Sequence, residues 1–205
     1  MKNMSWKAHT HKIANKISRS LGIINSLKNI LPRNILLTLY NSMILPHLQY
    51  SILSWGFNPG RVGTLQKRAV RLITGSKYNA HTEPIFKQTG LLKLEDIFNH
   101  TVLKFYYKFK KNKLPHYLQN MFHESEPPHS YNTRNRSAIR PVPTRISSSK
   151  CIRYHMPTLI EKTPVLIVEK TETHSTKGFS NYAKKYFLDL YKIECTVNNC
   201  YICNS

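Results

Sequence analysis

Two clusters of lysine and arginine have the residue types and spacing to bind phosphate groups. In the first cluster one cation lies three and four residues after two others, and in the second the cations lie four and three residues apart, so each set shares one side of a predicted helix. They are Lys67, Arg68 and Arg71 in the first cluster, and Lys104, Lys108 and Lys111 in the second. Cations in such a row can follow a phosphodiester backbone, which makes RNA or DNA the predicted ligand.

The aromatic residues of the second cluster admit two interpretations. Phe105, Tyr106 and Phe109 lie among its lysines, and aromatic rings can stack on exposed bases. The same spacing is typical of a helix whose aromatic side is core and whose lysines are merely solvated. We expect the aromatics in the core and, because both signs of charge normally mix on a surface that serves only solubility, the lysines on phosphate.

Further arginines lie in a stretch without helical spacing. Arg134 and Arg136 belong to residues 131–136, and two more arginines follow by residue 145. Guanidinium groups bind phosphates through paired hydrogen bonds, so this stretch could be an extended arm on a nucleic-acid strand. It could equally be held against the helical core through Tyr131 and Arg134.

The carboxylates are too few for nucleotidyl transfer. That chemistry uses two divalent ions held by several carboxylates, whereas the only aspartates are Asp96 and Asp189. Glu95 and Asp96 are neighbours on a predicted helix, where adjacent side chains diverge by about 100°, and the helix dipole alone favours them in a first turn. The sequence therefore predicts no catalytic residue and no cofactor.

Three cysteines near the C-terminus form an incomplete zinc pattern. Cys195, Cys200 and Cys203 supply three donors, whereas a structural zinc site needs four. The fourth would be Cys151 or a remote histidine such as His174. We predict unpaired thiols and no metal site, with zinc binding as the open alternative.

The charge balance narrows the class of partner. The chain has 31 Lys and Arg against 10 Asp and Glu, a net charge of +21, and residues 1–122 hold 19 of the cations and 3 of the acids. A folded region this basic repels itself unless a polyanion neutralises it. The sequence has no apolar run long enough to span a bilayer and no secretory leader at its start. We expect an intracellular protein, nuclear or cytoplasmic, with RNA or DNA as partner and no membrane or small-molecule substrate.

The elements that would position these cations are helices. Apolar residues at helical spacing predict helices over 4–29, 61–74 and 94–112, with Trp55 in the core. Between the first two, Pro32 should open a helix whose inward face includes Ile35, Leu39 and Ile44.

The amino-acid composition of the chain changes after residue 122. We predict a mainly α protein in three parts: a compact helical domain over 1–122, an irregular Pro/Ser/Arg-rich connector over 123–178, and a C-terminal helix with a cysteine-containing tail over 179–205. Short strands are expected within the connector at 151–154 and 165–168.

Several residue blocks occur in a fixed order along residues 4–145. They include Leu31-Pro-Arg-Asn-Ile-Leu-Leu, Pro46-His47, Trp55-Gly56, Leu65-Gln-Lys-Arg-Ala-Val-Arg-Leu-Ile-Thr-Gly75 and His129-x-Tyr131-x-Thr133-Arg134. Together they resemble the region after the polymerase palm in reverse transcriptases of non-LTR (LINE-like and jockey-like) retrotransposons. After residue 150 the match thins, because the stretch 156–164 lacks the family's Trp-Asn.

The resemblance implies a thumb-like helical domain that holds template–primer duplex or element RNA. It also implies that the palm carboxylates belong to a part of the polymerase that this chain does not contain. The chain would then be a fragment of an element's reading frame. The alternative is a co-opted, stand-alone basic module that binds RNA or DNA.

We expect no primer extension by this chain. Purified protein with a primed RNA template, nucleotides and Mg²⁺ or Mn²⁺ should leave the primer at its original length, because the carboxylates for two ions are missing. Metal-dependent extension that Asp96→Asn abolishes would contradict this prediction.

Overall fold

The computed structural model describes residues 6–120, 122 and 151–192. Within these ranges every regular element is a helix, so the predicted mainly α class is confirmed. The described residues form two compact units, 6–98 with 185–192 in one and 99–184 in the other. Helices α7 (Leu94–Lys110) and α11 (Thr176–Asp189) contribute residues to both units.

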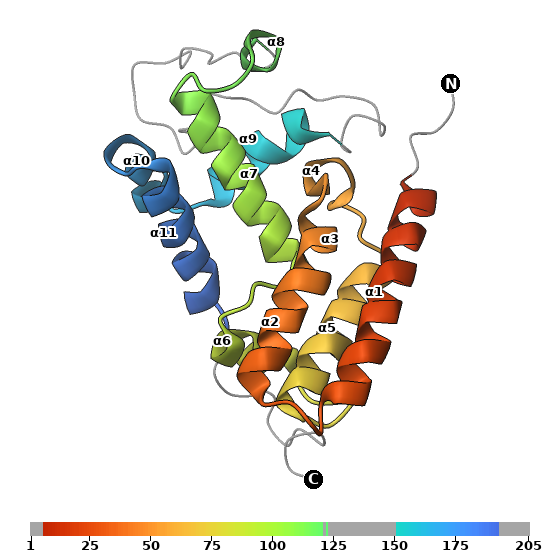
Figure 1. Ribbon diagram of the computed structural model, residues 1–205. Coiled ribbons are helices and arrows are strands. Elements are labelled where there is room, and N and C mark those ends of the chain that lie inside the picture. Colours follow the sequence, from red (N-terminus) through yellow and green to blue (C-terminus); the bar gives the residue numbers. More distant parts are fainter. Residues whose placement is uncertain (1–5, 121, 123–150, 193–205) are drawn as a thin grey trace. The chain divides into compact units, whose positions relative to one another are not determined.

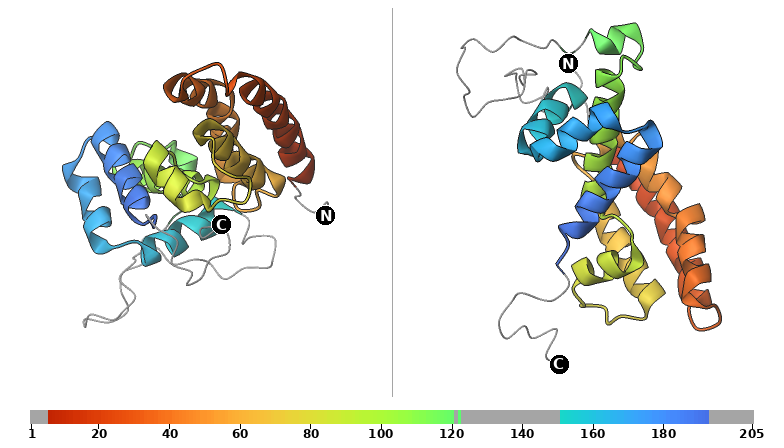
Figure 2. Two further views of the ribbon diagram at one scale, coloured as in Figure 1. Left: turned by 90° about the horizontal axis from the view of Figure 1, so that it is seen from below. Right: turned by 90° about the vertical axis from the view of Figure 1, so that its left-hand side faces the viewer.

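The unit formed by residues 6–98 and 185–192 is built around three helices. These are α1 (Lys7–Leu27), α2 (Arg33–Met43) and α5 (Arg61–Thr74), and each packs against the other two (Figures 1 and 2). On α1 the buried side chains follow the predicted helical period and include Ile13, Ile17, Leu21 and Ile24. The shorter helices of this unit are α3 (Leu45–Gln49), α4 (Ile52–Trp55) and α6 (Thr82–Thr89).

Proline and glycine lie where several of these helices begin or end. Pro46 lies in the first turn of α3, and Gly75 ends α5 in the left-handed conformation at φ 65°, which glycine adopts without steric cost. Gly56 has a different role, because a Cβ there would lie 2.6 Å from the Phe98 side chain and 2.7 Å from the Ile52 carbonyl oxygen. Trp55 beside it is fully buried, as predicted, and its Nε1 donates to the Tyr50 carbonyl.

The buried face of α2 is shifted by one residue from the predicted one, which included Ile35 and Leu39. Ile35 is 41% exposed, whereas Leu36 and Tyr40 are buried. Pro32 lies just before α2 as its N-cap, and Tyr40 is turned inward, where its hydroxyl meets Gln66. That buried polar contact selects the face of the helix, and the spacing of leucine and isoleucine alone does not reveal it.

Gln66 joins three segments in the middle of this unit. Its side chain is 1% exposed, and its Nε2 donates to the Tyr40 hydroxyl and to the Leu92 carbonyl, each at 2.9 Å. Its Oε1 accepts the backbone N–H of Leu94, the first residue of α7, at 2.7 Å. Burial raises the pKa of Tyr40 to about 12, so its hydroxyl stays neutral.

In the other unit, α7 continues beside three later helices and the short α8 (His116–Gln119). The later helices are α9 (Ile152–Lys162), α10 (Val165–Thr173) and α11 (Figure 2). Tyr107 stacks on Phe179 with ring centroids 5.0 Å apart, and its hydroxyl donates to the His174 carbonyl. None of the helices in the described ranges has the length and apolarity to cross a membrane.

The expectation of short strands at 151–154 and 165–168 is wrong. Residues 152–154 begin α9 and residues 165–168 begin α10. Pro164 is the N-cap of α10. At this position a proline does not interrupt the helix, because no helical hydrogen bond requires its missing N–H. Residues 151–178 of the predicted irregular connector are therefore largely helical, and the rest of it, 123–150, lies outside the described residues. The predicted C-terminal helix is present as α11.

Gln66→Leu should lower the free energy of unfolding by about 3 kcal/mol. The substitution keeps an apolar stem of similar size but leaves buried donors and acceptors without partners, each costing about 1–3 kcal/mol. Urea denaturation followed by circular dichroism measures the change. Gln88→Leu, at an exposed position of α6, is the control and should change stability by less than about 0.5 kcal/mol; equal effects would show that Gln66 is not a structural centre.

Candidate nucleic-acid interface

The first predicted cluster lies on α5, and two of its cations are exposed to solvent. Lys67 and Arg68 are exposed, while the opposite side of α5 is buried through Val62, Leu65, Gln66, Ala69, Val70 and Ile73. The helix therefore holds both cations outward through the packing of its other face. We call Lys67 and Arg68 the α5 cation pair.

Arg71, predicted as the third member of that cluster, is in a different environment. It is half-buried, and its Nε donates to the Ala80 carbonyl at 2.9 Å. Burial lowers the pKa of the guanidinium, and the charge effect of nearby Tyr78 opposes that shift. Tyr78 is 81% exposed, so an open aromatic ring lies close to this arginine, which the sequence analysis did not identify.

The second predicted cluster does not present three equivalent cations. Lys108 is exposed, whereas Lys104 is half-buried, and burial followed by repulsion from Lys108 lowers the pKa of Lys104. Lys111 follows the end of α7, and its Nζ donates to the Glu172 carbonyl at 3.1 Å. Among these three lysines, only Lys108 combines high exposure with a side chain that makes no hydrogen bond to another described residue.

The aromatics of α7 are core residues, as expected. Tyr106 and Phe109 are buried, and half-buried Phe105 packs edge-on against Phe122 at 5.9 Å. Phe109 contacts the same Phe122 ring at 5.4 Å. Phe105 and Phe109 are engaged with Phe122, and Tyr106 is buried, so these rings do not form an exposed platform for bases.

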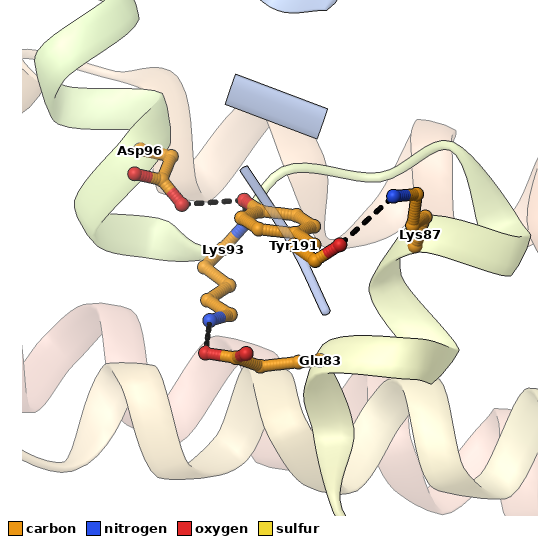
Figure 3. Close-up of polar contacts among 5 residues, drawn as sticks. All are labelled: Glu83, Lys87, Lys93, Asp96 and Tyr191. Carbon is orange, nitrogen blue, oxygen red and sulfur yellow. Dashed lines mark hydrogen bonds and ion pairs between the residues drawn. The ribbon is translucent and has the colours of Figure 1, made fainter. Parts of the chain in front are cut away.

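In the unit of 6–98 and 185–192, the acidic residues Glu83 and Asp96 both lie close to Tyr191 (Figure 3). The Tyr191 hydroxyl donates to Asp96 and accepts the backbone N–H of Lys93. Lys93 pairs with Glu83 and places its Nζ 4.6 Å from the centre of the Tyr191 ring. Lys87 Nζ donates to the Tyr191 carbonyl at 2.9 Å. We call these five residues the Tyr191 cluster.

Within the Tyr191 cluster, Asp96 has a structural role. Its carboxylate lies in the first turn of α7, as the helix dipole favours, and it also holds the segment after α11 through the Tyr191 hydroxyl. Burial raises the pKa of Asp96 and also that of Tyr191, so the phenol remains the donor. The hydrogen bond from Lys93 lowers the pKa of Glu83.

Two cations that the sequence analysis missed line a pocket with Arg71. Lys28 is the C-cap of α1, and Arg33 is the first residue of α2. Both line a pocket of about 460 Å³ that is also lined by the end of α5. The signal in the sequence is weak, because the two residues flank a helix–helix turn and are 38 or more positions from Arg71.

Five predicted positions lie outside the described residues. They are Arg134 and Arg136 of the proposed basic arm, and Cys195, Cys200 and Cys203 of the possible zinc pattern. Among the residues that the structure describes, no group of three or more His, Cys, Asp or Glu is arranged to hold a metal ion.

Comparison of the chain with models of protein families, with curated proteins and with solved structures finds no match to any of them.

Stability relative to the Asp96→Asn variant should fall as pH rises through the pKa of Asp96. Because the folded-state pKa lies above the unfolded value, the folded protein binds the proton more tightly, and the resulting stabilisation is complete only below the unfolded pKa. Urea unfolding of both proteins between about pH 3 and 7 measures the difference, with asparagine still able to accept from Tyr191. A wild type that gains stability over the variant as pH rises would contradict the assignment.

Proposed function

We propose that this chain is a non-catalytic, nucleic-acid-binding part of a non-LTR retrotransposon reverse transcriptase. It binds the phosphate backbone of template–primer or element RNA, and the α5 cation pair is its central contact. Family membership rests on the ordered residue blocks described above. The contact rests on the arrangement of charge.

The observation that carries the proposal is the absence of acids from one continuous part of the sequence. Residues 1–82 contain twelve Lys and Arg and no Asp or Glu, and these residues include α1 to α5. Their exposed cations include Lys12, Lys16, Arg19, Lys28, Arg61, Lys67 and Arg68. A surface that serves only solubility mixes both signs, whereas a surface of one sign attracts a polyanion.

The acids nearest in sequence do not neutralise this surface. Glu83 pairs with Lys93, and Asp96 accepts from Tyr191. Both are engaged within the Tyr191 cluster, at α6 and the start of α7, and the exposed Glu95 beside Asp96 belongs to α7 and not to α1 or α5. The cations of α1 and α5 therefore keep their charge available for phosphate.

The proposed chain performs no nucleotidyl transfer itself. Asp96 is engaged by Tyr191, and Asp189 ends α11 as an exposed residue. A co-opted binding module would use the same surface, and the reading frame upstream of Met1 separates the two origins: an in-frame or frameshifted palm with adjacent aspartates indicates a fragment.

Removing the α5 cation pair should flatten the salt dependence of nucleic-acid binding. For about five phosphate contacts, the slope of log K against log salt should be about −3.5 to −4.5, and losing two contacts in Lys67→Gln/Arg68→Gln should reduce its magnitude by about 1.4 on single strands and 1.8 on duplex. Fluorescence anisotropy with labelled oligonucleotides at several salt concentrations measures the slope. The reduction should be similar for all sequences.

The control is Arg153→Gln/Lys162→Gln, which removes the same charge from exposed positions of α9. It should leave the slope within about 0.3 of the wild-type value. If both double variants change the slope equally, binding follows net charge and the proposed surface is wrong. If neither protein nor variants bind at low salt while folded, the proposed function is wrong.

A further inference from the structure

The pocket beside the α1–α2 turn is lined by three cations from three helices. Lys28 comes from the end of α1, Arg33 from the start of α2 and Arg71 from the last turn of α5. They are separated in sequence but meet around one hollow of about 460 Å³, within the range of roughly 300–1,000 Å³ that small-molecule sites occupy. We call this hollow the basic pocket.

No carboxylate balances this charge among the described residues that line the basic pocket. Its other polar side chains are neutral: Asn29, Thr74 and Ser76. The Thr74 hydroxyl donates to the Val70 carbonyl at 2.9 Å, so Ser76 is the donor in the 2.7 Å hydrogen bond between the two hydroxyls, and both hydroxyl protons are used within the protein. The three cations are therefore the groups that a ligand would meet, and they favour a compact anion with several oxygens.

Arg71 is prepared for such an anion. Its Nε–H is fixed by the Ala80 carbonyl, which orients the guanidinium, and none of the described residues accepts a hydrogen bond from its terminal N–H groups. A guanidinium held in this way loses less freedom when it binds, because its fork is already oriented. Arg33 adds a second fork at the start of α2, where Pro32 offers no side-chain cap to the first backbone N–H groups.

Two helix C-termini also border the pocket, and their partial negative charge opposes an anion. Some of the carbonyls at these ends already accept hydrogen bonds. Leu27 accepts from Ile30 and Leu31 at the end of α1, and Arg71 accepts from Ser76 at the end of α5. The partial charge of about one half per helix end is smaller than three full positive charges, so the balance still favours an anion.

We propose that the basic pocket binds a terminal phosphate or a diphosphate, in addition to the backbone contact made by the α5 cation pair. The proposal rests on the proposed function in taking nucleic acid as one source of that phosphate, and a free diphosphate is the other source. Exposed Tyr78, close to Arg71, is the ring on which a terminal base would stack. Each source presents oxygens to Lys28, Arg33 and Arg71.

Binding of inorganic pyrophosphate to the full chain tests the pocket directly. Isothermal titration calorimetry should give an affinity for the wild type that falls about tenfold or more in Lys28→Gln/Arg33→Gln, because two charge-assisted contacts are lost. The matched control, Arg153→Gln/Lys162→Gln, removes one lysine and one arginine from exposed positions of α9 outside the pocket and should change the affinity less than about twofold. Arg71→Gln serves as a further variant, with circular dichroism to confirm its fold.

Oligonucleotides of one sequence, with and without a 5′-phosphate, separate the two sources. If the phosphate strengthens binding to the wild type and the gain disappears in the pocket variant, a nucleic-acid end is the ligand. If pyrophosphate binding depends on the pocket and the 5′-phosphate adds nothing, a free diphosphate is the ligand. Tyr78→Ala should reduce only the first of these gains.

The pocket proposal is overturned if pyrophosphate does not bind, or if the pocket and control variants lose affinity equally. Failure of the proposed function is distinguishable from this. If the Lys67→Gln/Arg68→Gln protein loses oligonucleotide binding but still binds pyrophosphate, both proposals are supported. If the wild type binds pyrophosphate but no oligonucleotide, only the nucleic-acid interface is ruled out.

Discussion

The side chain of Gln66 is the constraint on which the unit of 6–98 and 185–192 depends. A buried amide must satisfy its donors and acceptor inside the core, and here it does so with α2 through Tyr40 and with the start of α7 through Leu92 and Leu94. These bonds fix the rotation of α5. Lys67 and Arg68, the next two residues, are thereby held on the outside. A polar core contact thus positions the cations that the proposed function requires.

Much of this unit could be predicted because its signals are local. The helix over 61–74 was predicted with the bounds that α5 has, since its apolar residues recur at helical spacing and Gly75 can adopt positive φ. The exposure of Lys67 and Arg68, beside the buried Leu65 and Ala69, follows from the same helical spacing. Each inference needed only neighbours within a few turns of one helix.

The errors arose where tertiary contacts override local preference. Val165 to Val168 are β-branched or apolar and read as a strand, but Pro164 in the N-cap position starts a helix there. Ile35 fits a helical period with Leu39, yet Tyr40 turns inward to reach Gln66, which exposes Ile35. Neither the partner of Tyr40 nor the Ala80 carbonyl that holds Arg71 is visible from residue spacing.

The basic pocket and the α5 cation pair place different demands on a ligand. Cations that project from a helix into water bind any phosphodiester with similar strength, because each contact is screened and flexible. Arg71 is partly buried and oriented by its own hydrogen bond, and Lys28 and Arg33 approach the same hollow from two other helices. Such a site recognises the shape and charge density of a phosphate group, which are greatest at a chain end or a diphosphate. The unfolded chain carries the same net charge as the folded protein but has no basic pocket. A ligand of the proposed pocket would therefore bind the folded protein much more strongly than the unfolded chain, whereas phosphate contacts with exposed cations differ less between the two. Such binding would increase the stability of the fold.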